Sequence, residues 1–217
     1  EGKCEPLGLA VKPLTEERLK ATGHIVAQMG HEPIIEALKE GADIIICGRA
    51  YDPSPFAAAA MYRGHESALA YHLGKILECA ALCAEPGTTK DCMLGIIEKD
   101  SFIVRPLNER RKCTAISVAA HTFYEKDHPY LLHGPGIVLN LEHCTFTERG
   151  DGSVEARGSR IETTPVYKVK LEGAMKVAYR AFVVAGVRDP LLIGRIEQVE
   201  EEVKRQVAEY YEEIPPE

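Results

Sequence analysis

The stretch Gly41-Ala42-Asp43-Ile44-Ile45-Ile46-Cys47-Gly48 decides the fold that this sequence predicts. Its centre is a continuous β-branched run without alternation, which is typical of a parallel strand buried on both faces. Residues 33–40, just before it, carry apolar side chains at helical spacing, and Gly41 is suited to end that helix. Because helix, glycine, buried strand and glycine follow one another, we expect an α/β fold with a parallel sheet and flanking helices here.

The pattern changes in the second half of the chain. Short, roughly alternating segments separated by Gly or Pro turns predict antiparallel strands at residues 144–148, 153–157, 160–163, 166–171 and 177–185. Gly150-Asp151-Gly152 is the strongest hairpin signal among them. Residues 189–213 then predict one long amphipathic helix. We therefore expect two parts, an α/β part at residues 1–140 and an antiparallel α+β part at residues 141–217.

Composition excludes several classes of protein. The 217 residues carry 33 acidic and 26 basic side chains, a net charge of −7, and no long basic run, so nucleic acid is not an expected partner. The longest apolar run is too short for a bilayer, and no signal-peptide core opens the chain. Seven cysteines, an odd number without regular spacing, indicate reduced thiols. We expect a compact cytoplasmic homo-oligomer without a membrane anchor.

The loop after the predicted buried strand is the first candidate site, because ligands of open α/β sheets gather at the carboxyl ends of strands. Arg49 is suited to hold a carboxylate or phosphate, and Asp52 to act as a general base or to orient Arg49. Ser54 lies where the next helix begins, at an end that attracts anions. The alternative is an Arg–Asp pair that only closes the loop.

His121 is the best acid–base candidate, since imidazole titrates near neutral pH. Glu125 follows at the i, i+4 spacing that places both on one helix face. A buried, hydrogen-bonded structural histidine is the alternative. No HExxH motif or CxxC pair is present, so we predict no metal, although a site built on His121, Glu125 and His133 stays conceivable.

Two further polar groups are candidates for substrate binding. Glu85 belongs to a polar loop where a helix gives way to a strand, and Ser159 and Arg160 follow Gly158 in the antiparallel half. GxGxxG, Walker A and GxSxG motifs are all absent from the sequence. We therefore predict no cofactor.

Taken together, several segments resemble the acyclic terpene utilisation family, the AtuA-like proteins of bacterial isoprenoid catabolism. The segments are His24–Gly30, Gly41–Arg49 with Asp52, Glu78–Gly87, Ser117–Glu125 and Val169–Ala174. They are spread over most of the chain, and the Gly-Arg-x-x-Asp element at residues 48–52 is the most specific of them.

The resemblance implies a role in breaking down branched or terpene-derived acids, as free acids or CoA esters, beside a small partner protein. It also implies a longer protein, with a glycine-rich N-terminal α/β portion, of which this chain is a middle segment. It supplies no catalytic residues. Proton abstraction next to a carbonyl, or addition and loss of water, suits a base at Asp52 or His121 with Arg49 holding the acid, which makes a lyase or hydratase our hypothesis. The alternatives are a non-catalytic subunit that docks a catalytic partner and a metal-dependent hydrolase.

Overall fold

The computed structural model describes residues 4–8, 11–124, 128–180, 182 and 184–212. Contacts divide the chain into two compact units, Glu1–Lys176 and Val177–Glu217. The first unit contains the helices α1 (Glu16–Ala21), α2 (Glu32–Lys39), α3 (Ser54–Tyr62), α4 (Ser67–Leu77) and α5 (Ala115–Thr122) and the 3₁₀ turn η1 (Ala80–Cys83). The boundary expected near residue 140 stays a prediction, since this division measures compactness and not independent folding.

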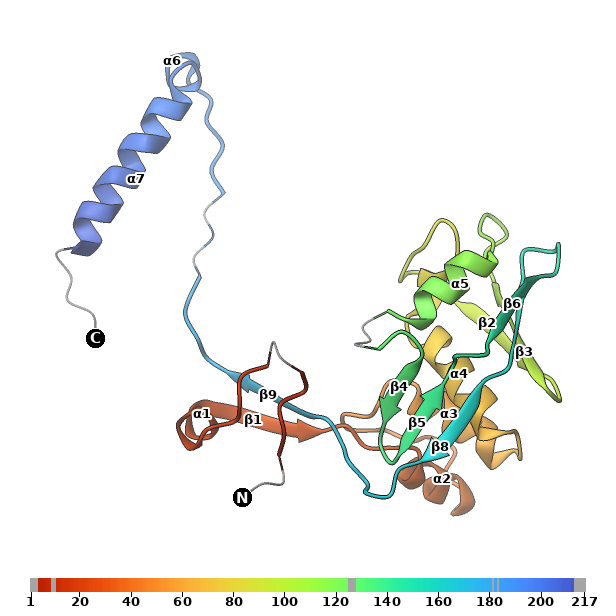
Figure 1. Cartoon of the computed structure of the whole chain (residues 1–217). Helices are drawn as coiled ribbons and strands as arrows, with labels where there is room; N and C mark the ends of the chain where they lie inside the picture. The colour runs from red at the N-terminus through yellow and green to blue at the C-terminus, as the bar shows by residue number, and fades with distance from the viewer. Residues whose placement is uncertain (1–3, 9–10, 125–127, 181, 183, 213–217) are drawn as a thin grey trace. The chain divides into compact units, whose positions relative to one another are not determined.

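The strands of the first unit form three antiparallel sheets (Figure 1). One sheet has the order β2 (Met93–Ile97), β3 (Ser101–Pro106), β7 (Val154–Arg157), β6 (Thr145–Glu148). The second has the order β4 (Leu131–Gly134), β5 (Ile137–Asn140), β8 (Arg160–Thr163), and the third is a ribbon of β1 (Thr22–Ala27) and β9 (Leu171–Met175). The hairpin predicted at Gly150-Asp151-Gly152 is confirmed, because β6 and β7 pair on either side of it.

Helix α4 is the centre of the first unit. It contacts strands of both larger sheets and the helices α3 and α5. Every residue from Ala68 to Ile76 is buried, as expected for a helix that is apolar on almost all sides. Leu69, Leu73 and Ile76 pack into one core cluster with Phe102 of β3, while Ala68, Ala70 and Tyr71 pack into a second. The helix therefore joins the cores beneath the two sheets.

The predicted parallel sheet is wrong. Asp43–Cys47 belongs to no strand, and Ile44 and Ile46 are 83% and 94% exposed. Among the described residues, the parallel pairing is limited to a single bridge between Met29 and Ala50. A β-branched run favours the extended backbone, but a ladder also requires a neighbouring strand, and no described strand pairs with this segment. The overall class, mixed α/β, agrees with the prediction.

Two predicted strands of the second half are also wrong. Residues 166–170 form no strand, and β9 begins only at Leu171. The described residues of 177–185 are extended without a partner strand, and Val184 is fully exposed.

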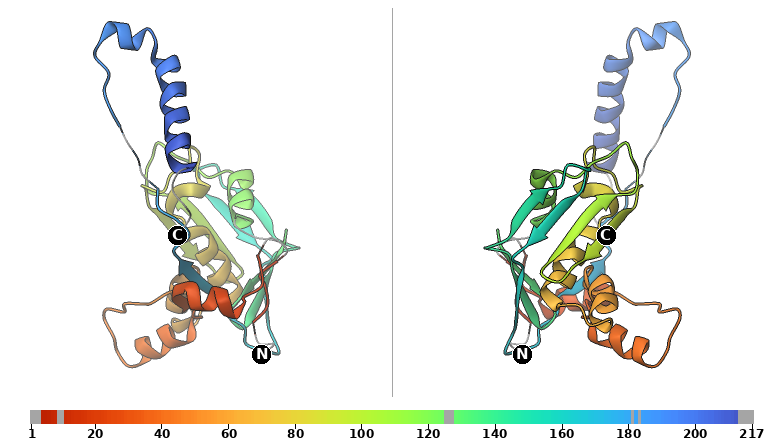
Figure 2. Two further views of the ribbon diagram at one scale, coloured as in Figure 1. Left: turned by 90° about the vertical axis from the view of Figure 1, so that its left-hand side faces the viewer. Right: turned by 90° about the vertical axis from the view of Figure 1, so that its right-hand side faces the viewer.

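The second unit consists of that extended segment and two helices. The predicted long helix is divided into α6 (Pro190–Ile193) and α7 (Ile196–Glu212). Asp189 caps α6 by accepting hydrogen bonds from the backbone of Leu191 and Leu192. The chain turns at α6, and α7 runs back in the opposite direction (Figure 2).

Candidate functional site

The loop between α2 and α3 is held against its neighbours by backbone contacts. Met29 donates to the carbonyl of Arg49, and Tyr51 donates to the carbonyl of Met29, at 3.1 and 2.9 Å. On the other side, a Cβ added to Gly74 would lie 2.7 Å from the carbonyl oxygen of Pro53. Gly74 thus allows the loop to pack directly on α4. The segment that carries Arg49 and Asp52 is therefore fixed at both ends.

Arg49 is the centre of an ion-pair cluster. Its Nη1 and Nη2 donate to the two carboxylate oxygens of Asp52 at 2.5 and 3.3 Å. Its Nε and Nη2 donate to the carboxylate of Glu172 on β9 at 2.6 and 3.3 Å, and Nη1 also donates to the carbonyl of Ala50 at 2.8 Å. A guanidinium has five N–H donors in a planar fork, so all of them are used here.

The same contacts shift the acidity of the cluster. Hydrogen bonds from Arg49 lower the pKa of Glu172 to about 2, with further help from Lys170 and Gln28. Hydrogen bonds to Asp52 and then to Glu172 raise the pKa of Arg49 still further above its ordinary value. The side chains of Arg49, Asp52 and Glu172 remain 32%, 47% and 30% exposed. Arg49 and Glu172 are therefore charged at neutral pH, and the cluster is open to solvent.

An open concavity of about 540 Å³ lies beside this cluster. Its lining residues are Ala27, Gln28, Met29, Gly30, Glu32, Pro33, Tyr167 and Val169. Gln28 connects the two features, because its amide donates to Glu172 at 2.8 Å. Two other lining residues are also joined, since the hydroxyl of Tyr167 donates to Glu32 at 3.1 Å. An acidic or polar ligand in the concavity would lie next to the charged cluster.

A second polar cluster is buried along α4. Lys75 and Glu78 form an ion pair whose side chains are only 2% and 8% exposed. The Lys75 ammonium lies 5.8 Å from the centroid of the Tyr124 ring, and that ring stacks on His121 at 5.7 Å. On the other side, burial and then the charge of Glu78 raise the pKa of Tyr51 above its ordinary value. The ion pair therefore lies close to Tyr124, just after α5, and its carboxylate acts on Tyr51 of the Arg49 loop.

A chain of aromatic groups leads from this buried cluster toward the concavity. Tyr51 stacks on Tyr71, with ring centroids 6.3 Å apart, and the Tyr71 hydroxyl lies 2.7 Å from Nδ1 of His31. Burial raises the pKa of Tyr71 to about 12. His31 precedes Glu32, a residue of the concavity wall. Ring contacts and one hydrogen bond thus connect His31, next to the concavity wall, with Tyr51.

The comparison with protein families adds a finding from the whole sequence. The family model described as acyclic terpene utilisation family protein AtuA matches residues 9–215. The chain belongs to the acyclic terpene utilisation family. Neither a search of the curated proteins nor a search of the solved structures found a significant match. In the parts of this family member that the structure describes, no helix combines the length and apolarity needed to span a membrane.

The remaining predicted site residues of this family member lie outside the Arg49 ion-pair cluster. Ser54 is fully buried in the first turn of α3. Glu85 accepts a hydrogen bond from the hydroxyl of Thr114, the N-cap of α5, at 2.6 Å. Ser159 contacts His72 at 2.7 Å, and Arg160 is exposed on β8. None of the contacts observed among described residues joins these side chains to Arg49.

Of the two predicted acid–base residues, His121 and Glu125, the structure describes only His121. His121 is 6% exposed and lies in the last turn of α5. Glu125 lies outside the described residues. No three His, Cys, Asp or Glu side chains are grouped as metal ligands in the described ranges, and His133 is exposed on β4. The metal-dependent hydrolase gains no support from this arrangement.

The sequence-based reasoning missed Glu172 and Lys75. Glu172 is an acidic residue within a stretch rich in lysine, between Lys170 and Lys176. Lys75 is a charged residue inside an otherwise apolar helix, three positions before Glu78. Each residue differs in charge or polarity from its neighbours in the sequence. A charged residue in such a position often has a specific partner, so this difference could have identified both.

Proposed function

We propose that the protein is an enzyme of branched or terpene-derived acid catabolism that moves a proton at the carbon next to a carbonyl, as a lyase or hydratase does. Its substrate is a small carboxylic acid or the corresponding CoA thioester. Membership of the acyclic terpene utilisation family supports the substrate class. The reaction class rests on the side chains around α4 and the Arg49 loop.

The observation that carries the proposal is the exposed Arg49–Asp52 pair, and the buried Lys75–Glu78 pair near Tyr51 and Tyr124 supports it as a second cluster of titratable groups. Removing two charges from water is unfavourable, and apolar residues of similar size are often at least as stabilising. Clusters of titratable groups with perturbed acidity occur preferentially at functional sites. A cluster of this kind beside an exposed Arg–carboxylate pair supports proton-transfer chemistry.

In this proposal Arg49 binds the carboxylate of the substrate in place of one of its protein carboxylates. Because all of its donors are used, a substrate carboxylate must replace one of the present carboxylates. Asp52 is the more exposed of the two and belongs to the same loop, whereas Glu172 has further hydrogen-bond donors in Gln28 and Lys170. The substrate therefore displaces Asp52, and the released carboxylate accepts a proton from the carbon next to the carbonyl.

The test begins with a thermal-shift screen of short branched acids and their CoA thioesters, because a ligand of the folded protein raises its stability. Turnover of each stabilising compound is then measured for Asp52→Asn, for His121→Ala and for the control Asp100→Asn in the turn between β2 and β3. We expect a loss on the order of a hundredfold or more in Asp52→Asn, the usual contribution of a general base, and no loss in the control. Unimpaired turnover in both site variants would contradict the assignment.

The non-catalytic subunit remains a second candidate because of α7. Ile196, Val199, Val203 and Val207 form one apolar stripe along this helix and are 37–52% exposed. The helix carries six glutamates but only Lys204 and Arg205 as basic residues. A complementary partner would present an apolar face with a basic rim.

A synthetic amphipathic helix of leucine and lysine serves as a probe of that second candidate. We expect it to bind the chain more weakly at high salt and not to bind the Val203→Asp variant. Binding that is indifferent to this substitution would contradict a docking role for the stripe. Turnover of any acid by residues 1–217 alone would contradict a purely non-catalytic subunit.

A further inference from the structure

A long hairpin of the first unit is broken at one point, and its two halves belong to different sheets. β5 pairs with β8 in one sheet, and β6 pairs with β7 in the other. The chain passes between the sheets at residues 141–144 on one strand and at residues 158–159 on the other. Irregular pairing of this kind re-aims side chains and is over-represented beside active sites. Cys144 and Ser159 occupy the break.

A directed chain of hydrogen bonds starts at this break and enters α4. The Cys144 thiol donates to the Ser159 hydroxyl at 3.7 Å, and the Ser159 hydroxyl lies 2.7 Å from Nδ1 of His72. Nε2 of His72 lies 3.2 Å from the hydroxyl of Thr122, and that hydroxyl donates to the carbonyl of Val118 at 2.9 Å.

The direction of the chain determines the tautomer of His72. The Thr122 hydroxyl has one hydrogen and gives it to Val118, so it accepts from Nε2 of His72. Nδ1 is then the unprotonated nitrogen, and it accepts the hydrogen of the Ser159 hydroxyl. A hydroxyl within hydrogen-bond reach of a base that a third group orients is the arrangement of an activated nucleophile.

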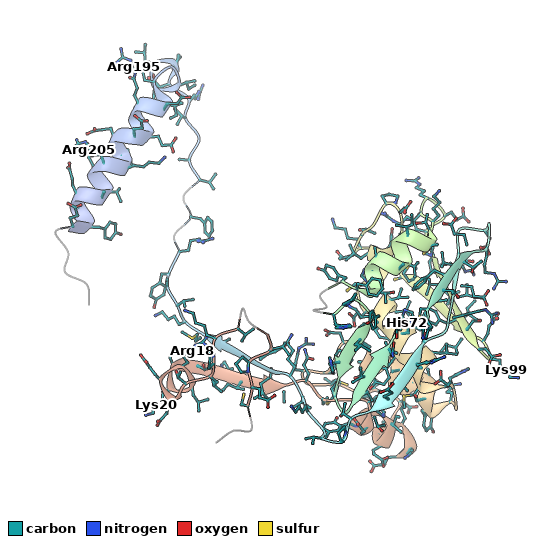
Figure 3. The ribbon with its side chains drawn as sticks, viewed as in Figure 1. Arg18, Lys20, His72, Lys99, Arg195 and Arg205 are labelled. Carbon is teal, nitrogen blue, oxygen red and sulfur yellow. The ribbon has the colours of Figure 1, made fainter. Side chains whose placement is uncertain are left out.

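The surroundings hold this arrangement in place and keep it accessible on one side. His72 lies inside the first unit (Figure 3) and is fully buried. Its ring makes edge-to-face contacts with Phe102 and Phe146, with centroids 4.9 and 5.9 Å apart. Ser159, in contrast, is only partly buried. Gly158 before it has φ +87°, and a Cβ there would lie 2.4 Å from the carbonyl oxygen of His143. Glycine is therefore required for the turn that presents Ser159.

We infer that Ser159 is a nucleophile for acyl transfer from an ester or thioester, with His72 as its general base and Thr122 as a positioning residue. The Ser159 oxygen bonds to the acyl carbon while its proton passes to Nδ1 of His72. The bond to the leaving alcohol or thiol then breaks, and the leaving group takes that proton. Water attacks the acyl-serine, gives a proton to His72, and Ser159 recovers it as the acid departs. This activity goes beyond the proton transfer proposed above, which uses none of these three residues.

The experiment exposes the full chain to an alkyl fluorophosphonate and follows the intact mass with time. The Ser159 oxygen displaces fluoride from phosphorus, and the proton leaves through His72. We expect one adduct, assigned to Ser159 by peptide mapping, that is absent from Ser159→Ala and still formed in Cys144→Ala. Incubation with p-nitrophenyl acetate is expected to give an acetyl adduct at the same residue.

The pH dependence of the labelling rate and the effect of Thr122 variants on it distinguish His72 as a general base from His72 as a structural residue. Burial lowers the pKa of His72 to about 3, so the labelling rate is expected to stay level between about pH 5 and 8. Thr122→Val is expected to slow labelling on the order of a hundredfold, whereas Thr122→Ser, which keeps the hydroxyl, retains the rate. The inference is overturned if the wild-type chain gains no adduct at Ser159, or if Ser159→Ala and Thr122→Val react as fast as the wild type.

Discussion

The polar groups along α4 and those around Arg49 differ in how far they are exposed to solvent. Lys75, Glu78 and His72 are almost fully buried inside the first unit. Arg49, Asp52 and Glu172 are all about one-third to one-half exposed. Removing one partner of a buried ion pair strongly lowers the free energy of unfolding, because the remaining charge is poorly solvated. Removing one partner of an exposed pair lowers it only slightly. The first cluster should therefore govern stability, and the second should be free to exchange partners with a ligand.

The largest effect is expected from breaking the buried pair. Lys75→Met leaves the Glu78 carboxylate without its cation in a position that is 8% exposed. We expect a loss of about 3–5 kcal/mol in the free energy of unfolding. Urea denaturation followed by circular dichroism measures it, since the chain has no tryptophan.

The control for that experiment is the double variant Lys75→Met with Glu78→Leu. Replacing both charges by apolar side chains is expected to recover most of the lost stability. If Lys75→Met is as stable as the wild type, the Lys75–Glu78 pair is solvated in solution. The claim that this pair is buried and the Arg49 cluster exposed would then be wrong.

The next effect is a pH dependence that comes from His72. Its pKa is lowered by burial from 6.5 to about 3, so below pH 6.5 the unfolded chain binds a proton that the native chain does not. Stability due to the neutral ring is full above pH 6.5 and falls with acidification by up to roughly 1.4 kcal/mol per pH unit. Urea midpoints at pH 7, 6 and 5 test this, with His72→Gln expected to flatten the slope. An unchanged slope in a folded His72→Gln variant would refute it.

A smaller effect is expected at the exposed cluster. Arg49 lowers the pKa of Glu172 from 4.5 to about 2, so its stabilising contribution is present above about pH 4.5 and is lost as the pH falls toward 2. Because the groups are partly exposed, we expect Glu172→Gln to lower stability at pH 7 by about 1 kcal/mol or less. The loss should shrink in 1 M salt, which screens such pairs. A decrease of several kcal/mol in the free energy of unfolding that does not change with salt would contradict this, because it would show that the cluster is shielded from solvent as the buried pair is.

The smallest effect is expected in the second unit. Val203 on α7 is 52% exposed, and none of the described residues of α7 is buried. Val203→Ser should change the unfolding free energy of the chain by less than about 0.5 kcal/mol. A larger loss, seen in the same urea titration, would mean that α7 is packed against an apolar surface in solution.

The hairpin of the antiparallel half could be predicted from the sequence and the parallel strand of the first half could not, for a physical reason. A hairpin such as that at Gly150–Gly152 is specified by neighbouring residues, because the turn itself aligns its two strands. A parallel strand at Asp43–Cys47 depends on a partner far away in the chain. The apolar run indicates a tendency to extend, but the pairing is not encoded locally.

The candidate site shows the same limit. Arg49 and Asp52 are three residues apart, so their contact follows from a short loop and was among the predicted possibilities. Glu172 reaches Arg49 only because β9 pairs with β1, and Ser159 reaches His72 only because a hairpin changes sheets. Spacing in the sequence cannot reveal such encounters. Ser159 was predicted as a substrate-binding residue, and that stays a prediction. The role inferred above rests on its contact with His72.

The most direct test of proton transfer is exchange of solvent deuterium into the carbon next to the carbonyl. Branched acids and CoA thioesters that stabilise the chain are incubated with it in D₂O, and the loss of the carbon-bound proton is followed by NMR. The account predicts exchange with the wild-type chain and the Asp100→Asn control, slowed on the order of a hundredfold in Asp52→Asn. Exchange at the same rate in Asp52→Asn, or none with any stabilising compound, would contradict the account.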